Sequence, residues 1–154
     1  MTNDIVTKKM VFLYLINYAE DNEFTILAIN TFLKDLKNDD AKIRGLALRS
    51  LCSLKYKSAY DYYANSLYDA LKDQSAYVRK TAVIGLLKVY HLNPKLISEK
   101  DIDTLYEMIK DTDPLVVTNT IFVLNEMLRA EGGIAISNKM IVYLLNRIKV
   151  KFIF

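Results

Sequence analysis

Charged side chains that recur at a regular spacing are the residues of this sequence best placed to do chemistry. Asp73 and Arg79 stand on either side of a predicted turn, and Arg44 and Asp111 occupy equivalent places in the copies before and after it. A guanidinium and a carboxylate in these places can tie one loop to its neighbour, although exposed pairs contribute only ~0.2–1 kcal/mol each. We therefore predict a structural ladder of Arg44, Asp73, Arg79 and Asp111, with no catalytic role.

The ladder is expected to vary at its two ends. In the first copy, Asp39 or Asp40 is the acidic partner that we expect for Arg44. In the third copy, Val117 stands where the arginine would be. The ladder is therefore predicted to stop there.

The remaining candidates for catalysis or metal binding are single residues. His91, the only histidine, ends a predicted helix, where a cation suits the helix dipole, and it has no acidic or thiol neighbour in sequence. Cys52, the only cysteine, can form no internal disulfide and is expected to be inert packing. The sequence offers no zinc-ligand spacing and no glycine-rich phosphate loop. We expect no catalytic, cofactor-binding or metal-binding residue.

Two segments match the tyrosine-x-x-bulky pattern of cytosolic sorting signals. They are Tyr68–Leu71 and Tyr106–Ile109, and both lie inside predicted amphipathic helices. Because the tyrosine and the bulky residue of each segment fall on the apolar stripe, we interpret both segments as core packing.

The charge of the chain is a weak guide to its partners. A net charge of +3 is too small to imply a nucleic-acid partner, which usually meets a concentrated basic face. A locally basic stretch is diluted by acidic residues, and it fits either a solvated face or a contact for an anionic membrane or an acidic partner. Its basic members are Lys34, Lys37, Lys42, Arg44, Arg49, Lys55 and Lys57.

Composition and hydrophobic periodicity predict one all-α domain. The 154 residues are 52% hydrophobic and include only 4 glycines and 2 prolines, so helices must fill most of the chain. We expect the first helix to be apolar on nearly all sides and buried between neighbours on both flanks. Apolar positions recur at helical spacing in eight segments, at about residues 5–19, 22–36, 39–54, 60–71, 75–91, 98–110, 113–131 and 137–150.

These helices belong to an internal repeat. The segment Leu71–Leu86 matches an earlier copy at an offset of 35 residues and a later copy at an offset of 38. Such periods are typical of stacked helical hairpins, so we predict an α-solenoid of HEAT-like or armadillo-like repeats with a right-handed superhelix. Both ends would lack a polar cap, and we expect the segment to self-associate through them. Repeats are expected at about 22–54, 57–91 and 98–131, with half-repeats at 4–19 and 137–150.

The sequence also favours a reducing compartment. It contains no Asn-x-Ser/Thr sequon, its start lacks the apolar run of a signal peptide, and no apolar run is long enough for a bilayer span. We therefore expect a cytosolic location.

Several sequence blocks go beyond a generic helical array. In order and spacing they resemble the trunk of β-adaptins, and they are Lys8–Leu15 followed by Asn17–Tyr18, then Ile43–Arg49, then Tyr77–Val83. Three shorter stretches are most similar to the beta chains of the fourth adaptor complex, namely Leu51–Leu54, Glu131–Gly133 and Leu144–Arg147. The resemblance covers about residues 5–148.

The resemblance implies a large subunit, not an enzyme, of a heterotetrameric adaptor coat that selects cargo and forms vesicles at the trans-Golgi network or endosomes. The implied partners are the medium chain, the small chain and the second large chain of the complex, together with an Arf-type GTPase in its GTP state. Membrane association would be peripheral, through the complex, on the cytosolic face. Neither a cofactor nor a nucleic-acid partner is implied.

Two other classes of function stay open on sequence alone. A nuclear-transport receptor or a phosphatase scaffold would share the repeated placement of Asp and Val-Arg. A helical-repeat DNA glycosylase would be an enzyme, but it needs an aromatic cradle and a basic groove. The absence of tryptophan and the net charge of +3 argue against a glycosylase.

Overall fold

The chain folds into helices throughout its described parts, which in the computed structural model are residues 4–18, 23–54 and 59–151. These residues contain no strand, and the prediction of an all-α fold is confirmed. Among the described helices, none has both the length and the hydropathy that a membrane span requires. The helices are α1 (Ile5–Tyr18), α2 (Glu23–Asp35), α3 (Ala41–Leu51), α4 (Ala59–Ala70), α5 (Ala76–Leu92), α6 (Glu99–Met108), α7 (Pro114–Met127) and α8 (Asn138–Lys151), with 3₁₀ turns at Pro94–Leu96 and Arg129–Glu131.

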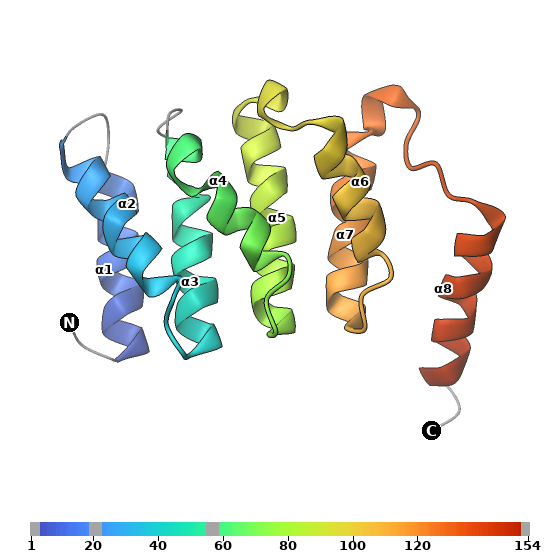
Figure 1. The fold of residues 1–154 in the computed structure, drawn as a ribbon, viewed down its shortest axis with the longest axis horizontal. Coiled ribbons are helices and arrows are strands. Elements are labelled where there is room, and N and C mark those ends of the chain that lie inside the picture. The colour runs from blue at the N-terminus through green and yellow to red at the C-terminus, as the bar shows by residue number, and fades with distance from the viewer. Residues whose placement is uncertain (1–3, 19–22, 55–58, 152–154) are drawn as a thin grey trace.

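The helices alternate between two layers (Figure 1). α1, α3, α5 and α7 lie side by side in one row, and each contacts the next. α2, α4 and α6 form the second layer, with α2 packed on α3, α4 on α5 and α6 on α7. Because each unit of two antiparallel helices packs on the next, the fold is the predicted α-solenoid.

The core runs continuously along the row, between the two layers. Its largest side chains are at most 1% exposed and come from successive helices, as Phe32, Leu48, Tyr63 and Leu86 do. Packing is close at Gly85 of α5, where an added Cβ would lie 2.8 Å from the Cys52 sulfur. The small residue is therefore required by packing at this position.

Capping residues fix where several helices begin. Asp40 precedes α3 and Asp113 precedes α7, and each carboxylate accepts the backbone N–H two residues later, at 2.8 Å. Ser75 takes the N-cap position of α5 without a side-chain capping bond, and its own backbone N–H instead donates to Asp73 Oδ1 at 2.7 Å. Residue 22, where the second predicted helical segment begins, lies outside the described residues.

The end of α7 differs from the prediction. The sequence predicted a helical segment over about residues 113–131, but α7 already ends at Met127 and the chain tightens into the 3₁₀ turn Arg129–Glu131. Gly132 follows that turn in the left-handed conformation, with φ 98°. Since glycine has no Cβ, it adopts this φ without the strain that other residues would carry.

The first helix is packed on fewer sides than predicted. Phe12 of α1 is buried and meets Phe32 edge to face, with ring centroids 4.7 Å apart. Met10 and Tyr14, on other sides of α1, are 69% and 60% exposed. The expectation that α1 is buried on both flanks is wrong for the described chain, because α1 stands at one end of the row and packs mainly on α2 and α3.

The last helix, α8, packs on the rest of the chain through only part of its apolar surface. Figure 1 shows α8 at the C-terminal end of the row, beyond α6 and α7. Met140 and Leu144 pack against the core, and the Tyr143 hydroxyl donates to the carbonyl oxygen of Lys110 at 3.4 Å. Several other apolar side chains of α8 stay exposed, among them Val142 and Leu145.

Candidate interaction surfaces and the inter-repeat ladder

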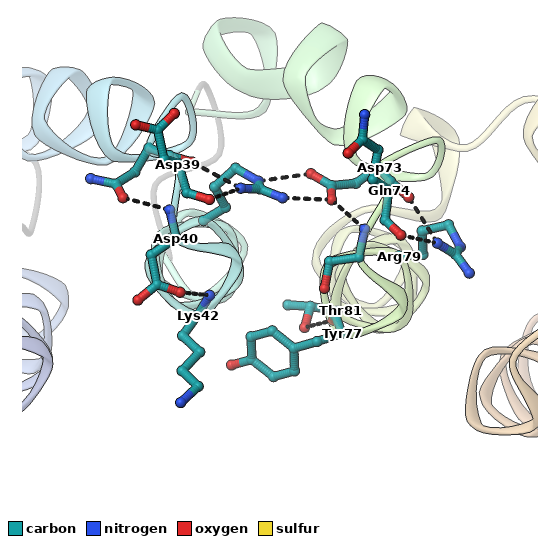
Figure 2. A network of polar contacts seen from close by, with 11 residues as sticks. Asp39, Asp40, Lys42, Asp73, Gln74, Tyr77, Arg79 and Thr81 are labelled. Atoms are coloured by element: carbon teal, nitrogen blue, oxygen red, sulfur yellow. Dashed lines mark hydrogen bonds and ion pairs between the residues drawn. The ribbon is translucent and has the colours of Figure 1, made fainter.

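Arg44 joins its own turn to the turn of the next repeat. Its Nε and Nη2 donate to the two carboxylate oxygens of Asp73, at 2.9 and 2.8 Å, and its Nη1 donates to the carbonyl oxygens of Asn38 and Asp39. Figure 2 shows these bonds running between the turn before α3 and the turn before α5. The guanidinium is therefore fixed by three groups at once.

The expected pairing of Arg44 with Asp39 or Asp40 is wrong. Asp40 uses its carboxylate to cap α3, and Asp39 offers Arg44 its backbone carbonyl instead of its side chain. The carboxylate that Arg44 meets belongs to Asp73, 29 residues further along the chain. Stacking of the repeats, which sequence neighbours do not reveal, supplies this partner.

Arg79 repeats the same geometry one repeat later. Its Nε and Nη2 donate to the Asp111 carboxylate at 2.7 and 2.9 Å. Its Nη1 donates to the carbonyl oxygens of Asp73 and Gln74 (Figure 2). The hydrogen bonds from Arg44 hold the pKa of Asp73 below its ordinary value, and those to Asp111 raise the pKa of Arg79. The structure thus brings Arg44, Asp73, Arg79 and Asp111 together as two bidentate ion pairs between repeats.

A further pair, which the sequence reasoning missed, lies at the start of the row. Lys8 Nζ of α1 is 2.7 and 2.6 Å from the two carboxylate oxygens of Asp35 at the end of α2, and both side chains are less than 10% exposed. Lys8 stands one repeat before Arg44, so extending the ladder backwards along the sequence would have found it. The apolar residues around this lysine in the sequence give no local sign of a buried ion pair.

Single residues with catalytic potential are placed without partners for chemistry. His91 is exposed in the last turn of α5, whereas Cys52 is buried, and burial raises the pKa of its thiol to about 12. No group of three or more potential metal-ligating side chains occurs in the parts of the chain that the structure describes. A nucleophilic thiolate at Cys52 is therefore disfavoured at neutral pH.

The two sorting-signal patterns are part of the core, as predicted. Leu71 and Ile109 are buried, and Tyr68 and Tyr106 pack partly buried against the core cluster. The Tyr68 hydroxyl lies 3.1 Å from that of Tyr60, and the Tyr106 hydroxyl accepts the backbone N–H of Ala135. Neither segment is available as an extended peptide ligand.

The exposed surface offers two features for partners. Apolar side chains of α1 and α2 are at least half exposed, and they include Val6, Met10, Leu13, Tyr14, Ile26 and Leu27. Exposed apolar patches of this kind mark interaction sites. The charges are also segregated, because α1, α3 and α5 contain no acidic residue while α4 and α6 carry mainly acidic ones.

The row of hairpins, the ladder between repeats and the exposed apolar helices define a helical-repeat protein with broad surfaces for partners. The family model described as the adaptin N terminal region matches residues 1–151. The chain belongs to this family, and the resemblance to the β-adaptin trunk is confirmed.

The relatives that the chain matches agree with its assignment to this family. The chain is 41% identical over 150 residues to mouse AP-4 complex subunit beta-1, covering 95% of this chain and 20% of that relative. It is 40% identical over 161 residues to Beta-adaptin-like protein A of Arabidopsis thaliana, covering 96% of this chain and 19% of the relative. It is 37% identical over 128 residues to human AP-1 complex subunit beta-1, covering 82% of this chain and 14% of the relative. The chain thus spans a fifth or less of the length of these relatives.

Proposed function

We propose that this chain acts as a scaffold segment of an adaptor-complex beta subunit in vesicle-mediated protein transport. The observation that carries the proposal is the match to the adaptin N-terminal family over residues 1–151, together with beta-subunit relatives at about 40% identity. Cargo sorting and coat assembly at the trans-Golgi network or endosomes are the roles that we infer for the complex. The complex would lie on the cytosolic face of these membranes and associate with them peripherally.

The proposed partners are the medium chain, the small chain and the second large chain of the complex, with an Arf-type GTPase as a further partner. Support comes from the exposed apolar side chains of α1 and α2, which a stable soluble helix pair would otherwise bury. In this proposal affinity comes from surface contributed by several helices. No single residue is expected to dominate it.

The role is that of a non-catalytic scaffold. The adaptin family match favours it over a nuclear-transport receptor or a phosphatase scaffold, which sequence reasoning had left open. The same match favours the scaffold role over a DNA glycosylase.

Affinity purification tests the proposal. The tagged chain is incubated with cytosol from its own cell type, and the bound proteins are identified by mass spectrometry. We expect medium, small and second large adaptor chains, and we expect the double variant Met10→Asp/Leu13→Asp to recover less of them. The matched control is Asn65→Asp/Asn138→Asp, which makes the same change of charge at exposed polar positions. Recovery of nuclear-transport cargo or phosphatase subunits instead of adaptor chains would contradict the proposal.

A further inference from the structure

A small basic pocket lies between α3 and α5. Its volume is about 200 Å³, and Arg49, Lys80 and Lys88 contribute the charged groups to its lining, with no acidic residue among them. Tyr77 and Thr81 also line it, and Figure 2 shows both on the side of α3 and α5 that faces away from the Asp73 and Arg79 ladder. The pocket is therefore separate from the ion pairs that join the repeats.

The three cations of this pocket lack carboxylate partners among the described residues. The ladder carboxylates are already bound to Lys8, Arg44 and Arg79, and α3 and α5 contain no acidic residue of their own. Lys88 is half-buried, and its ammonium donates to the Ser53 hydroxyl at 2.6 Å.

Burial, with the nearby charge of Arg49, lowers the pKa of Lys88. A partly desolvated ammonium gains more from an anion than an exposed one, because the low local dielectric strengthens the attraction. An anionic group in this pocket would therefore be stabilised by all three cations.

A wider groove continues from the pocket across α3 toward α1. Its volume is about 690 Å³, and it shares Arg49 and Tyr77 with the pocket. Lys9 and Lys42 add positive charge to it, and Ile5 and Leu46 add apolar wall. Its one acidic residue is Asp40, whose carboxylate is occupied in capping α3.

Tyr77 forms the boundary between the pocket and the groove. Its ring lies against Gly45 of α3, where an added Cβ would come within 2.2 Å of the ring. Lys42 and Tyr77 emerge on the same side of α3 and α5 (Figure 2). The ring is thus held across α3 by backbone contact, so the two hollows form one track from α5 to α1.

The size and lining of the track select the kind of ligand. A hollow of about 200 Å³ is smaller than a typical drug-sized site, so it suits one carboxylate-bearing side chain. The groove has both cations and apolar wall, which suits an apolar residue flanked by acidic ones. An anionic membrane is a poorer fit, because a flat surface meets the exposed Arg49 but does not reach the half-buried Lys88.

We propose that α1, α3 and α5 bind an extended acidic peptide, with one of its carboxylates between Arg49, Lys80 and Lys88 and an adjacent apolar side chain in the groove beyond Tyr77. The binding goes beyond the proposed coat role and does not depend on it. It uses only side chains of this chain and can be measured with the chain alone.

Fluorescence anisotropy with a labelled glutamate-rich peptide carrying one leucine tests the proposal. The triple variant Arg49→Gln/Lys80→Gln/Lys88→Gln should bind it at least about tenfold more weakly. The matched control, Lys34→Gln/Lys72→Gln/Lys100→Gln, makes the same change of charge at exposed positions and should stay within about twofold of the unmodified chain. Raising the salt concentration should weaken binding to the unmodified chain.

Three outcomes would overturn the proposal. The first is equal binding of a peptide in which glutamine replaces glutamate, and the second is equal loss in the pocket variant and the control. The third is binding to vesicles containing phosphatidylserine without binding to the peptide, which would indicate a membrane headgroup instead. If the triple variant does not fold by circular dichroism, the single variant Lys80→Glu, at a partly exposed position, replaces it and should also lower affinity.

Discussion

The buried pair of Lys8 and Asp35 gives the sharpest test of the packing. The ammonium is within 2.7 Å of both carboxylate oxygens, and the side chains are only 8% and 7% exposed. Replacing Lys8 with methionine keeps most of the volume but leaves the carboxylate buried without its cation. Breaking a buried pair in this way costs about 3–5 kcal/mol of unfolding free energy.

Thermal and urea denaturation measure the loss. For a chain of this size, about 3–5 kcal/mol corresponds to a fall in Tm of about 6–20 °C. The double variant Lys8→Met/Asp35→Leu should recover most of the loss, because replacing both partners with apolar groups removes the buried charges together. Lys9→Met, at the exposed neighbouring position, is the control and should change Tm little.

The double-variant comparison can refute this reasoning. If Lys8→Met/Asp35→Leu is as unstable as the two single variants added together, the groups are not coupled. If Lys8→Met alone has no effect, water reaches the carboxylate and the pair is not buried. Hydrogen exchange of α1 amides locates the change, since a solenoid can lose its terminal unit while the central repeats persist.

Three other expectations follow from the structure. Ala82→Asp should cost several kcal/mol of unfolding free energy, because Ala82 is 0% exposed and the new carboxylate would have no partner. Lys80→Asp, at a partly exposed position, should be mild. Equal melting temperatures of the two variants would contradict this expectation. Arg44 holds the pKa of Asp73 below its ordinary value near 3.8. The extra stability of the unmodified chain over Asp73→Asn should therefore be fully present above pH 3.8 and be lost as the pH falls through the lower pKa of the folded state. Urea denaturation across this pH range measures the difference, and a pH-independent difference would refute the expectation. The chain should self-associate with rising concentration, and Met10→Asp should reduce the association; sedimentation showing a monomer at high concentration would exclude it.

Local sequence signals predicted the helices well because each acts within a few residues. The apolar stripe of Tyr60, Tyr63 and Leu67 needs no distant partner to favour α4, and all three residues are buried as expected. Asp113 followed by proline predicts the start of α7 by capping chemistry alone. The repeat spacing then predicts that the helices stack, because each hairpin has apolar residues that it cannot bury alone.

Partners across the stack could not be predicted in the same way. Arg44 has acidic residues close in sequence, yet it binds the carboxylate of Asp73, since stacking brings the next turn to its guanidinium while Asp40 is occupied in capping α3. α1 has an apolar sequence on most sides, but at one end of the row only the side toward α2 and α3 is covered.

The sequence by itself determined the helical repeat, the helix start at Asp113, and the absence of acidic residues from α1, α3 and α5. The tertiary structure alone decided that Lys8 is buried against Asp35, and that Arg49, Lys80 and Lys88 surround one hollow. Periodicity is a property of neighbouring residues, whereas these groups meet only when helices from different repeats pack at a fixed distance and rotation. That packing depends on contacts such as Tyr77 on Gly45, for which the linear order of residues has no local signal.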